Sequence, residues 1–261
     1  MNATRFARLL ALCALIGLAP LAVSTPSRAS GGEEKPQDVQ WSFDGPTGTY
    51  DRAALQRGYK IYREVCVSCH SMNLIYYRNL EALGYNEAQI KNIAGEYTYM
   101  DGPDDEGEMF ERPGMPSDRF KAPFANAKQA AAANNGAIPP DLSLIAKARA
   151  GGPDYIFSLL TGYEEHAPHG HVLQNGQHWN RYMSGNVISM APPLADGQVT
   201  YEDGTPQTLE QYARDISHFL MWAADPYMEQ RKQTGLKVII FLIVFAGIMY
   251  ALKKKTWKDA H

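Results

Sequence analysis

The chain has 261 residues, of which 25 are Lys or Arg and 28 are Asp or Glu, and 45% of the residues are hydrophobic. This length suits one sizeable globular domain with an appendage, and the near balance of charge excludes a nucleic-acid binder. Ordinary hydrophobic and charged fractions also exclude a disordered chain and a polytopic membrane protein.

The N-terminus has the layout of a secretory signal peptide. Arg5 and Arg8 precede fifteen mostly apolar residues at 9–23, and Ser27 and Ala29 are the small residues that cleavage after Ala29 requires. We therefore predict a cleaved signal peptide at 1–29, and a retained membrane anchor is the alternative.

A second apolar segment lies near the C-terminus. Fifteen apolar or neutral residues at 238–252 lie between Lys237 and a lysine cluster at 253–258 that contains Trp257. Snorkelling lysines and an interfacial tryptophan can extend such a run across a bilayer, whereas a buried core helix is the alternative. We predict a transmembrane helix at 231–255.

These two segments define the domain organisation. We expect residues 30–230 to form the exported domain and residues 256–261 a cytoplasmic tail, in a single-pass protein of the bacterial inner membrane with the domain in the periplasm. Residues 30–230 carry 15 basic and 27 acidic side chains, a formal charge of −12. Such a domain is expected to attract cationic partners.

The cysteines give the clearest chemical signal. Only Cys66 and Cys69 remain after cleavage, in the sequence Cys-Val-Ser-Cys-His that ends at His70. In an exported protein this motif predicts one covalent haem c, because thiols at this spacing reach the two vinyl groups of a porphyrin and the adjacent imidazole ligates the iron. A disulfide, a redox dithiol and a zinc half-site are the alternatives; no second cysteine pair completes a zinc site, and no run of strands surrounds the motif.

Helical periodicity predicts two helices that cross beside the haem. The first is expected at 51–69, where Gly58 permits a close crossing, and the second carries an apolar stripe at 209–220. Thr208 and Gln211 form a potential capping box for the second helix. Ordinary core packing is the alternative explanation of both stripes.

Shorter helices are expected between these two. One lies at 125–133, one runs from Asp141 to Arg149 and one from Asp154 toward Leu160, with both aspartates as N-caps. With little sheet expected, the predicted fold class is mainly α.

A haem that shuttles electrons requires a second axial ligand. Thioether sulfur favours Fe(II), and Met190 lies in Ile-Ser-Met-Ala-Pro-Pro-Leu, where two prolines fix the direction of the chain. Met190 is therefore the preferred distal ligand and Met183 the second candidate, although most methionines simply fill the core.

Five motifs, in order along the chain, carry a family resemblance. They are Cys-Val-Ser-Cys-His-Ser-Met at 66–72, Asn-Asn-Gly-Ala-Ile-Pro-Pro-Asp-Leu-Ser at 134–143, Phe-Ser-Leu-Leu-Thr-Gly-Tyr at 157–163, Met-Ala-Pro-Pro-Leu at 190–194, and Trp-Ala-Ala-Asp-Pro at 222–226 leading to the basic segment at 231–237. From about residue 38 to residue 257 the chain resembles cytochrome c1, the haem subunit of the ubiquinol:cytochrome c oxidoreductase, or cytochrome bc1 complex.

The resemblance implies a fold and a set of haem ligands. The fold is a cytochrome c-like haem domain with long loop insertions, followed by one C-terminal transmembrane helix. Cys66 and Cys69 carry the thioethers of one haem c, His70 is the proximal ligand and Met190 is the distal ligand.

Four further residues match family positions near the haem. Arg149 is placed against a haem propionate, which in a partly desolvated site requires a charge-assisted donor. A charge at the C-terminus of a helix is the alternative role of Arg149. Asn134, Pro140 and Tyr155 match less specific positions around the haem.

The resemblance also implies the reaction and the partners. A Rieske iron–sulfur protein reduces the haem, a cationic cytochrome c oxidises it, and cytochrome b and membrane lipid surround the anchor. Electron transfer is outer-sphere, without an acid, base or nucleophile in this chain. The alternatives are a free-standing tethered cytochrome outside any complex, and a haem peroxidase or gas-binding protein with an open sixth position.

Two polar segments remain. The first puts six carboxylates in eleven residues, which we interpret as a docking site for the cationic acceptor, with a merely solvated loop as the alternative. Its members are Asp101, Asp104, Asp105, Glu106, Glu108 and Glu111.

The second contains four histidines in a stretch rich in glycine and proline. Their spacing matches no strong ligand pattern, so an exposed loop is preferred to a metal site. They are His166, His169, His171 and His178.

Overall fold

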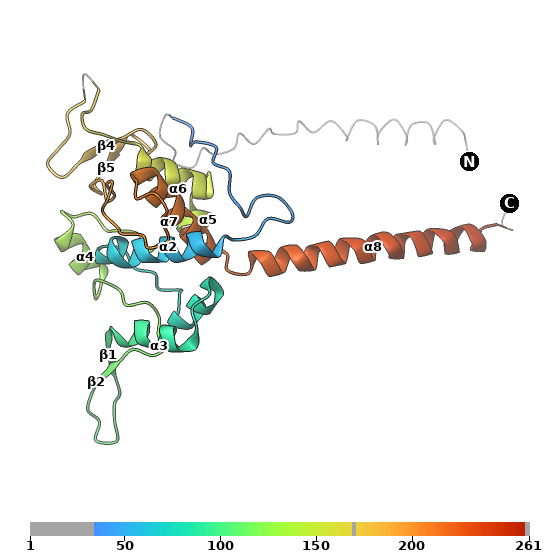
Figure 1. Cartoon of the computed structure of the whole chain (residues 1–261), viewed down its shortest axis with the longest axis horizontal. Coiled ribbons are helices and arrows are strands. Elements are labelled where there is room, and N and C mark those ends of the chain that lie inside the picture. Colours follow the sequence, from blue (N-terminus) through green and yellow to red (C-terminus); the bar gives the residue numbers. More distant parts are fainter. Residues whose placement is uncertain (1–33, 169–170, 259–261) are drawn as a thin grey trace, which may run out of the picture.

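The computed structural model describes residues 34–168 and 171–258, which form a helical domain with one long helix leading away from it (Figure 1). The predicted signal peptide at 1–29 lies outside these residues and stays a prediction. The mainly α fold class with a C-terminal helix is confirmed.

The secondary structure is as follows. The helical elements are α2 (Arg52–Glu64), the 3-10 turns η1 (Cys66–Ser68) and η2 (Tyr77–Leu83), α3 (Glu87–Gly95), α4 (Ala127–Ala133), α5 (Ile145–Ala148), α6 (Gly152–Thr161), α7 (Leu209–Ala224) and α8 (Met228–Thr256). The strands are β1 (Thr98–Asp101), β2 (Phe110–Pro113), β3 (Tyr163–Glu164), β4 (His178–Asn180) and β5 (Val187–Ile188).

The strands make two small antiparallel sheets. β1 and β2 form a hairpin in which Thr98 is opposite Pro113 and Asp101 is opposite Phe110. The other sheet has the order β3-β4-β5. The little sheet that the sequence predicts is therefore confined to short pieces on the edges of the helical body.

The packing of α2 against α7 forms the centre of the domain (Figure 1). Asp51 caps α2 by accepting hydrogen bonds from the amides of Ala53 and Ala54. Thr208 caps α7, as predicted, and accepts from the amide of Gln211 at 3.3 Å. Of the predicted capping box only this half forms in the described part of the chain, and Asp196 Oδ1 accepts from the amide of Leu209 at 2.6 Å.

An aromatic core lies where these two helices meet. Tyr59 and Tyr62 of α2 pack against Phe219 of α7, and Phe120 packs on both tyrosines, with ring centroids about 6 Å apart. Trp222 continues the cluster along α7. Each buried ring removes a large apolar surface from water, so this cluster contributes to holding the two helices together.

The predicted helix at 51–69 ends early. α2 stops at Glu64 because Val65, at φ −121° and ψ −62°, leaves the helical conformation, and the chain tightens into η1. The cysteine motif therefore lies on a short turn after the helix.

Both aspartates predicted as N-caps of the middle helices have other roles. α5 is short and begins after Leu144, while the carboxylate of Asp141 is taken up by the segment that follows the cysteine motif. α6 begins after Gly151, whose left-handed φ of 86° suits glycine. Asp154 sits in the first turn of α6 and accepts from the indole nitrogen of Trp41 at 2.6 Å.

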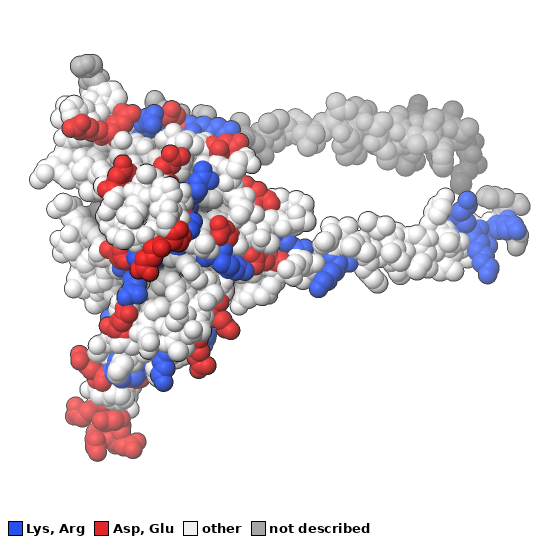
Figure 2. Space-filling view, viewed as in Figure 1, with Lys and Arg blue, Asp and Glu red and all other residues white. Residues whose placement is uncertain are grey.

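α8 is the long helix that leaves the domain. It has 29 residues, a length of about 43 Å, which exceeds the hydrocarbon thickness of a bilayer. Its apolar side chains are exposed, with Ile243 67% exposed, so the buried-helix alternative does not apply in this fold. Within the described ranges it is the one helix long and apolar enough to cross a membrane. Figure 2 shows its apolar middle bounded by basic side chains at both ends.

Ion pairs and hydrogen bonds fix the start of α8 to the domain. The carboxylate of Asp225, which follows α7, accepts two bonds from Arg231 at 2.7 and 2.6 Å. It also pairs with Lys147 of α5 at 3.0 Å. Glu229 accepts from the amide of Tyr50 at 2.7 Å and from Arg52 at 2.6 Å. The joint between the domain and its anchor is thus held from three segments of the chain.

Candidate functional site

The cysteine motif forms a tight turn with two thiols on it. The amides of Cys69 and His70 donate to the carbonyl of Cys66 at 3.2 and 2.9 Å. Both cysteines are free and half-buried. Burial, followed by the nearby Cys69 thiol, raises the pKa of Cys66 to about 12, so the thiol is neutral in this environment.

His70 is held in the form that an iron ligand requires. Its Nδ1 lies 2.8 Å from the carbonyl oxygen of Pro140. Because a carbonyl only accepts, Nδ1 carries the proton and Nε2 keeps its lone pair for a metal. Burial lowers the pKa of His70 against the opposing effects of the Pro140 carbonyl and Asp141, which favours the neutral ring.

These features fit a covalent haem. Two free thiols at the attachment spacing lie next to a neutral imidazole whose outer nitrogen is already oriented. The predicted residues Cys66, Cys69, His70 and Pro140 are therefore brought together by the fold.

The segment after His70 is joined to the segment that follows Pro140. We call residues 70–74 and 140–143 the loop junction. Asp141 accepts from the Ser71 hydroxyl and from the amides of Asn73 and Ser143, each at 2.8 Å. Burial acts to raise the pKa of Asp141, but these hydrogen bonds outweigh it and lower the pKa below its usual range. Sequence reasoning missed this role, because an aspartate after two prolines is also typical of a helix N-cap.

A second cluster contains the candidate distal ligands. The Tyr155 hydroxyl donates to Met183 Sδ at 3.7 Å, and the Tyr163 hydroxyl donates to the carbonyl of Met190 at 3.1 Å. Within residues 34–168 and 171–258, no hydrogen bond ends on the sulfur of Met190. Met190 therefore keeps an uncommitted thioether with its backbone anchored, whereas the sulfur of Met183 already has a donor.

Arg149 lies close to this cluster. Burial raises the pKa of Tyr155, and the positive charge of Arg149 opposes that rise. Arg149 is half-buried and, among the described residues, pairs with no Asp or Glu; its guanidinium has only a long 3.4 Å contact to the carbonyl of Ala148. It follows α5 in an extended conformation, and the basic residue in the last turn of α5 is Lys147. Arg149 is the C-cap residue of α5, and its guanidinium faces the carbonyl of Ala148 at this helix end.

Asn134 shapes the loop that leads to Pro140. Its side-chain amide donates to the carbonyl of Ala130 at 2.7 Å and so closes the end of α4. The next two residues, Asn135 and Gly136, have φ values of 51° and 85°, which reverse the chain. Asn134 is therefore placed as a turn former on the path to the loop junction.

The histidine-rich stretch is partly structured. His178 begins β4, and the ring of His171 packs on Trp179 with centroids 4.7 Å apart. His169 lies outside the described residues. Across the described ranges there is no group of three or more His, Cys, Asp or Glu side chains that could hold a metal ion.

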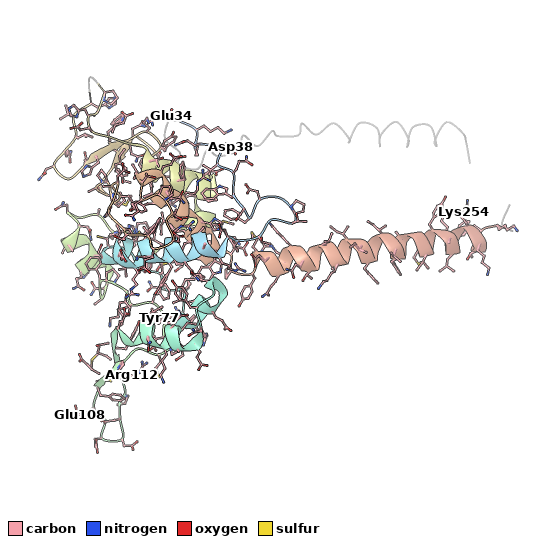
Figure 3. All side chains as sticks on the ribbon, viewed as in Figure 1. Glu34, Asp38, Tyr77, Glu108, Arg112 and Lys254 are labelled. Atoms are coloured by element: carbon pink, nitrogen blue, oxygen red, sulfur yellow. The ribbon has the colours of Figure 1, made fainter. Side chains whose placement is uncertain are left out.

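The acidic run forms the β1–β2 hairpin. Figure 1 shows this hairpin projecting from the side of the domain, in a direction different from that of α8. Arg112 lies nearer its base and Glu108 nearer its tip (Figure 3). Asp101 pairs with Arg112, and Asp104 accepts from the amides of Glu106 and Glu108 at 3.0 and 2.9 Å. Acidic side chains gather at the tip in Figure 2.

Comparison with known proteins identifies the family. The model of the cytochrome C1 family matches residues 41–260. A cytochrome c1 from Rhodospirillum rubrum is 46% identical over 254 residues, which cover 92% of this chain and 93% of that protein. The mitochondrial heme protein cytochrome c1 of Saccharomyces cerevisiae is 46% identical over 217 residues, covering 83% of this chain and 70% of the relative.

A third relative is longer. The cytochrome b/c1 of Bradyrhizobium diazoefficiens is 49% identical over 256 residues, which cover 90% of this chain but only 37% of that protein. Matches of this extent, together with the haem-binding motif, leave one family. The chain belongs to the cytochrome c1 family, the haem c subunits of the cytochrome bc1 complex.

Proposed function

We propose that this chain attaches one haem c through Cys66 and Cys69, ligates its iron with His70 and Met190, and relays single electrons from a Rieske iron–sulfur protein to a cationic cytochrome c. The observation that carries the proposal is the hydrogen bond from His70 Nδ1 to Pro140, beside the two free thiols of the attachment motif. When bound, the haem supplies the one-electron couple.

The side chains of this subunit bind and orient the haem. His70 presents a neutral ring, and Met190 presents a thioether whose backbone is anchored by Tyr163. Arg149 is available to neutralise a propionate, because no described carboxylate pairs with it. Tyr155 donates a hydrogen bond to Met183, and Asn134 closes the end of α4. The carbonyl of Pro140 orients His70.

The anchor and the hairpin meet different partners. α8 inserts in the membrane as a single span beside cytochrome b, with its lysine-rich end in the cytoplasm and the haem domain in the periplasm. The acidic tip of the β1–β2 hairpin supplies a negative field for a cationic acceptor. Electron transfer is outer-sphere, so the chain needs no general acid, base or nucleophile.

Reduced-minus-oxidised spectra and redox titration test the ligand set. The wild type should give a low-spin c-type spectrum and a high midpoint potential. Met190→Leu should lower that potential by more than about 100 mV, because a thioether stabilises Fe(II). Met183→Leu is the matched control and should leave the ligation intact. If Met190→Leu leaves both the spectrum and the potential unchanged, another residue is the distal ligand.

Purification in mild detergent tests the assignment to a complex. Full-length chain should co-purify with a di-haem cytochrome b and an iron–sulfur protein. Recovery of the chain alone, with fully reducible haem, would instead support a free-standing tethered cytochrome. Binding of carbon monoxide to the reduced wild type would support an open sixth position and would count against Met190 as a ligand.

A further inference from the structure

The loop junction is built from five hydrogen bonds between residues 70–74 and 140–143. They are His70 Nδ1 to Pro140 O at 2.8 Å, Ser71 Oγ to Asp141 Oδ2 at 2.8 Å, Asn73 N to Asp141 Oδ2 at 2.8 Å, Leu142 N to Ser71 O at 2.8 Å and Leu74 N to Ser143 Oγ at 3.0 Å. Residues seventy positions apart in the chain are thus held in register directly after the proximal histidine.

Asp141 is the centre of this junction. Its Oδ2 accepts two of the five bonds, and its Oδ1 accepts from the amide of Ser143 at 2.8 Å, which turns the chain after the prolines. No other side chain of the junction accepts from both segments. A carboxylate with three donors of this geometry holds its neighbours more strongly than a neutral acceptor does.

Pro140 depends on Asp141 for its position. Pro139 and Pro140 have no amide hydrogen, so they cannot anchor themselves by donating. The next residue, Asp141, is the strongest fixed point for the carbonyl of Pro140.

That carbonyl in turn acts on His70. A hydrogen bond from Nδ1 to an acceptor sets the tautomer and the plane of the ring and increases the basicity of Nε2. A more basic proximal ligand favours Fe(III), so the strength of this bond affects the redox equilibrium of the haem.

We propose that Asp141 is a positioning residue for the haem: by joining residues 71–73 to residues 141–143 it places the Pro140 carbonyl against His70 Nδ1 and thereby sets the orientation and donor strength of the proximal ligand. This rests on the proposed ligation of the iron by His70. Asp141 does not touch the iron, and its effect is transmitted through Pro140.

The test uses Asp141→Asn in the full-length, haem-loaded protein. An amide places NH₂ where one carboxylate oxygen accepted, so in either orientation at least one of the three bonds is lost. The bond from His70 to Pro140 should weaken, and the ratio of reduced to oxidised haem at a fixed potential should rise about threefold, which is about 30 mV at 59 mV per tenfold. The EPR g values of the oxidised low-spin haem should shift as well, because they report the plane of the imidazole ring.

Two further variants separate positioning from general stability. Ser71→Ala removes one of the three bonds to Asp141 and should change the same two readouts in the same direction by a smaller amount. Asp196→Asn is the matched control, because Asp196 accepts from the amide of Leu209 at the start of α7, away from the loop junction. It should lower the unfolding temperature without changing the g values or the ratio.

The outcomes are distinct. Unchanged g values and redox ratio in Asp141→Asn, with a loss of stability like that of the control, would overturn the proposal and leave Asp141 as a turn residue. If Asp141→Asn does not accumulate with haem, Ser71→Ala carries the test with the same readouts and the same criterion. Failure of the Met190→Leu experiment refutes the proposed ligand set instead, and is recognised separately because it concerns the distal side.

Discussion

Gly58 of α2 lies against the backbone of Asp215 on α7. A Cβ atom added at Gly58 would be 2.2 Å from the carbonyl oxygen of Asp215 and 2.6 Å from the Cβ of Phe219. The two helices therefore cross with their backbones almost in contact. On the same turn, the buried carboxylate of Asp215 accepts from Arg57 at 2.8 and 3.0 Å and from the Tyr201 hydroxyl at 2.9 Å, which fixes the crossing in register.

Gly58→Ala should therefore destabilise the domain. Neither contact atom belongs to a flexible side-chain end, so α2 and α7 must move apart, at a cost of about 2 kcal/mol or more in the free energy of unfolding. Gly95→Ala is the matched control, because a Cβ at Gly95 in α3 meets nothing within 4 Å. Urea unfolding of the full chain in detergent measures both. Equal midpoints for the two variants would mean that the crossing is looser than the structure shows.

The second prediction concerns His218, which is buried on α7 among aromatic rings. Its ring centroid is 6.2 Å from Trp41, 4.9 Å from Phe43 and 5.8 Å from Tyr50. Its Nε2 accepts from the amide of Asp51 at 3.2 Å, just before α2. Burial lowers the pKa of His218 to about 4, against the opposing charge of Asp51 and with the help of three nearby arginines.

Because the folded pKa of His218 lies below its unfolded value, the unfolded chain binds the extra proton first as the pH falls. Stability is then complete above about pH 6.5 and decreases toward pH 4, by about 2 kcal/mol between pH 7 and pH 4.5. His218→Gln keeps an acceptor for the Asp51 amide but does not titrate. Its unfolding free energy should lose about 2 kcal/mol less than that of the wild type over this interval. If the unfolding free energies of the wild type and His218→Gln fall in parallel with pH, the His218 ring is already charged or solvated in the folded protein.

The third prediction concerns the joint with the membrane helix. The carboxylate of Asp225 pairs with both Arg231 and Lys147, and its side chain is only 6% exposed. Asp225→Asn removes the negative charge from both ion pairs. With that joint weakened, the haem domain should take a wider range of tilts relative to α8. EPR of oriented membranes should show broader angular dependence of the haem g axes. Glu96→Gln, which breaks an exposed ion pair with Arg63, should leave the orientation unchanged. An unaltered angular dependence in Asp225→Asn would assign the joint to Glu229 and its partners.

Local signals were enough for much of the fold and the site. Spacing predicts the haem-binding roles of Cys66 and His70, the periodic stripes place the helix starts at Asp51 and Thr208, and an unbroken apolar run predicts α8. Each of these depends on residues within one or two turns of each other, which is the range that a sequence pattern can reveal.

The missed features depend on distant partners. Asp141 looked like an N-cap, yet its donors are Ser71 and Asn73, almost seventy residues earlier. Asp154 similarly accepts a hydrogen bond from the indole nitrogen of the distant Trp41. A carboxylate before a helical stripe is equally compatible with both roles, and only the packed chain decides which donors reach it.

The β1–β2 hairpin is the last case, because its six acids were predicted as a docking loop and the structure gives them unequal roles. Asp101 pairs with Arg112, and Asp104 holds the turn by accepting from the amides of Glu106 and Glu108. A variant that tests docking should therefore keep Asp101 and Asp104. The remaining exposed acids can be neutralised without loss of these bonds. The substitutions are Asp105→Asn, Glu106→Gln, Glu108→Gln and Glu111→Gln.

Neutralising this tip should slow association with a cationic cytochrome c by about tenfold at low ionic strength and flatten the salt dependence of the rate, because the steering field weakens. The matched control removes the same charge from four exposed glutamates elsewhere, namely Glu81, Glu87, Glu202 and Glu210. Stopped-flow measurement of the association rate against salt compares the two sets, and the midpoint potential should be unchanged in both. An equal loss of rate in the control would show that the overall negative charge of the domain steers the acceptor, and that the hairpin is no special docking site.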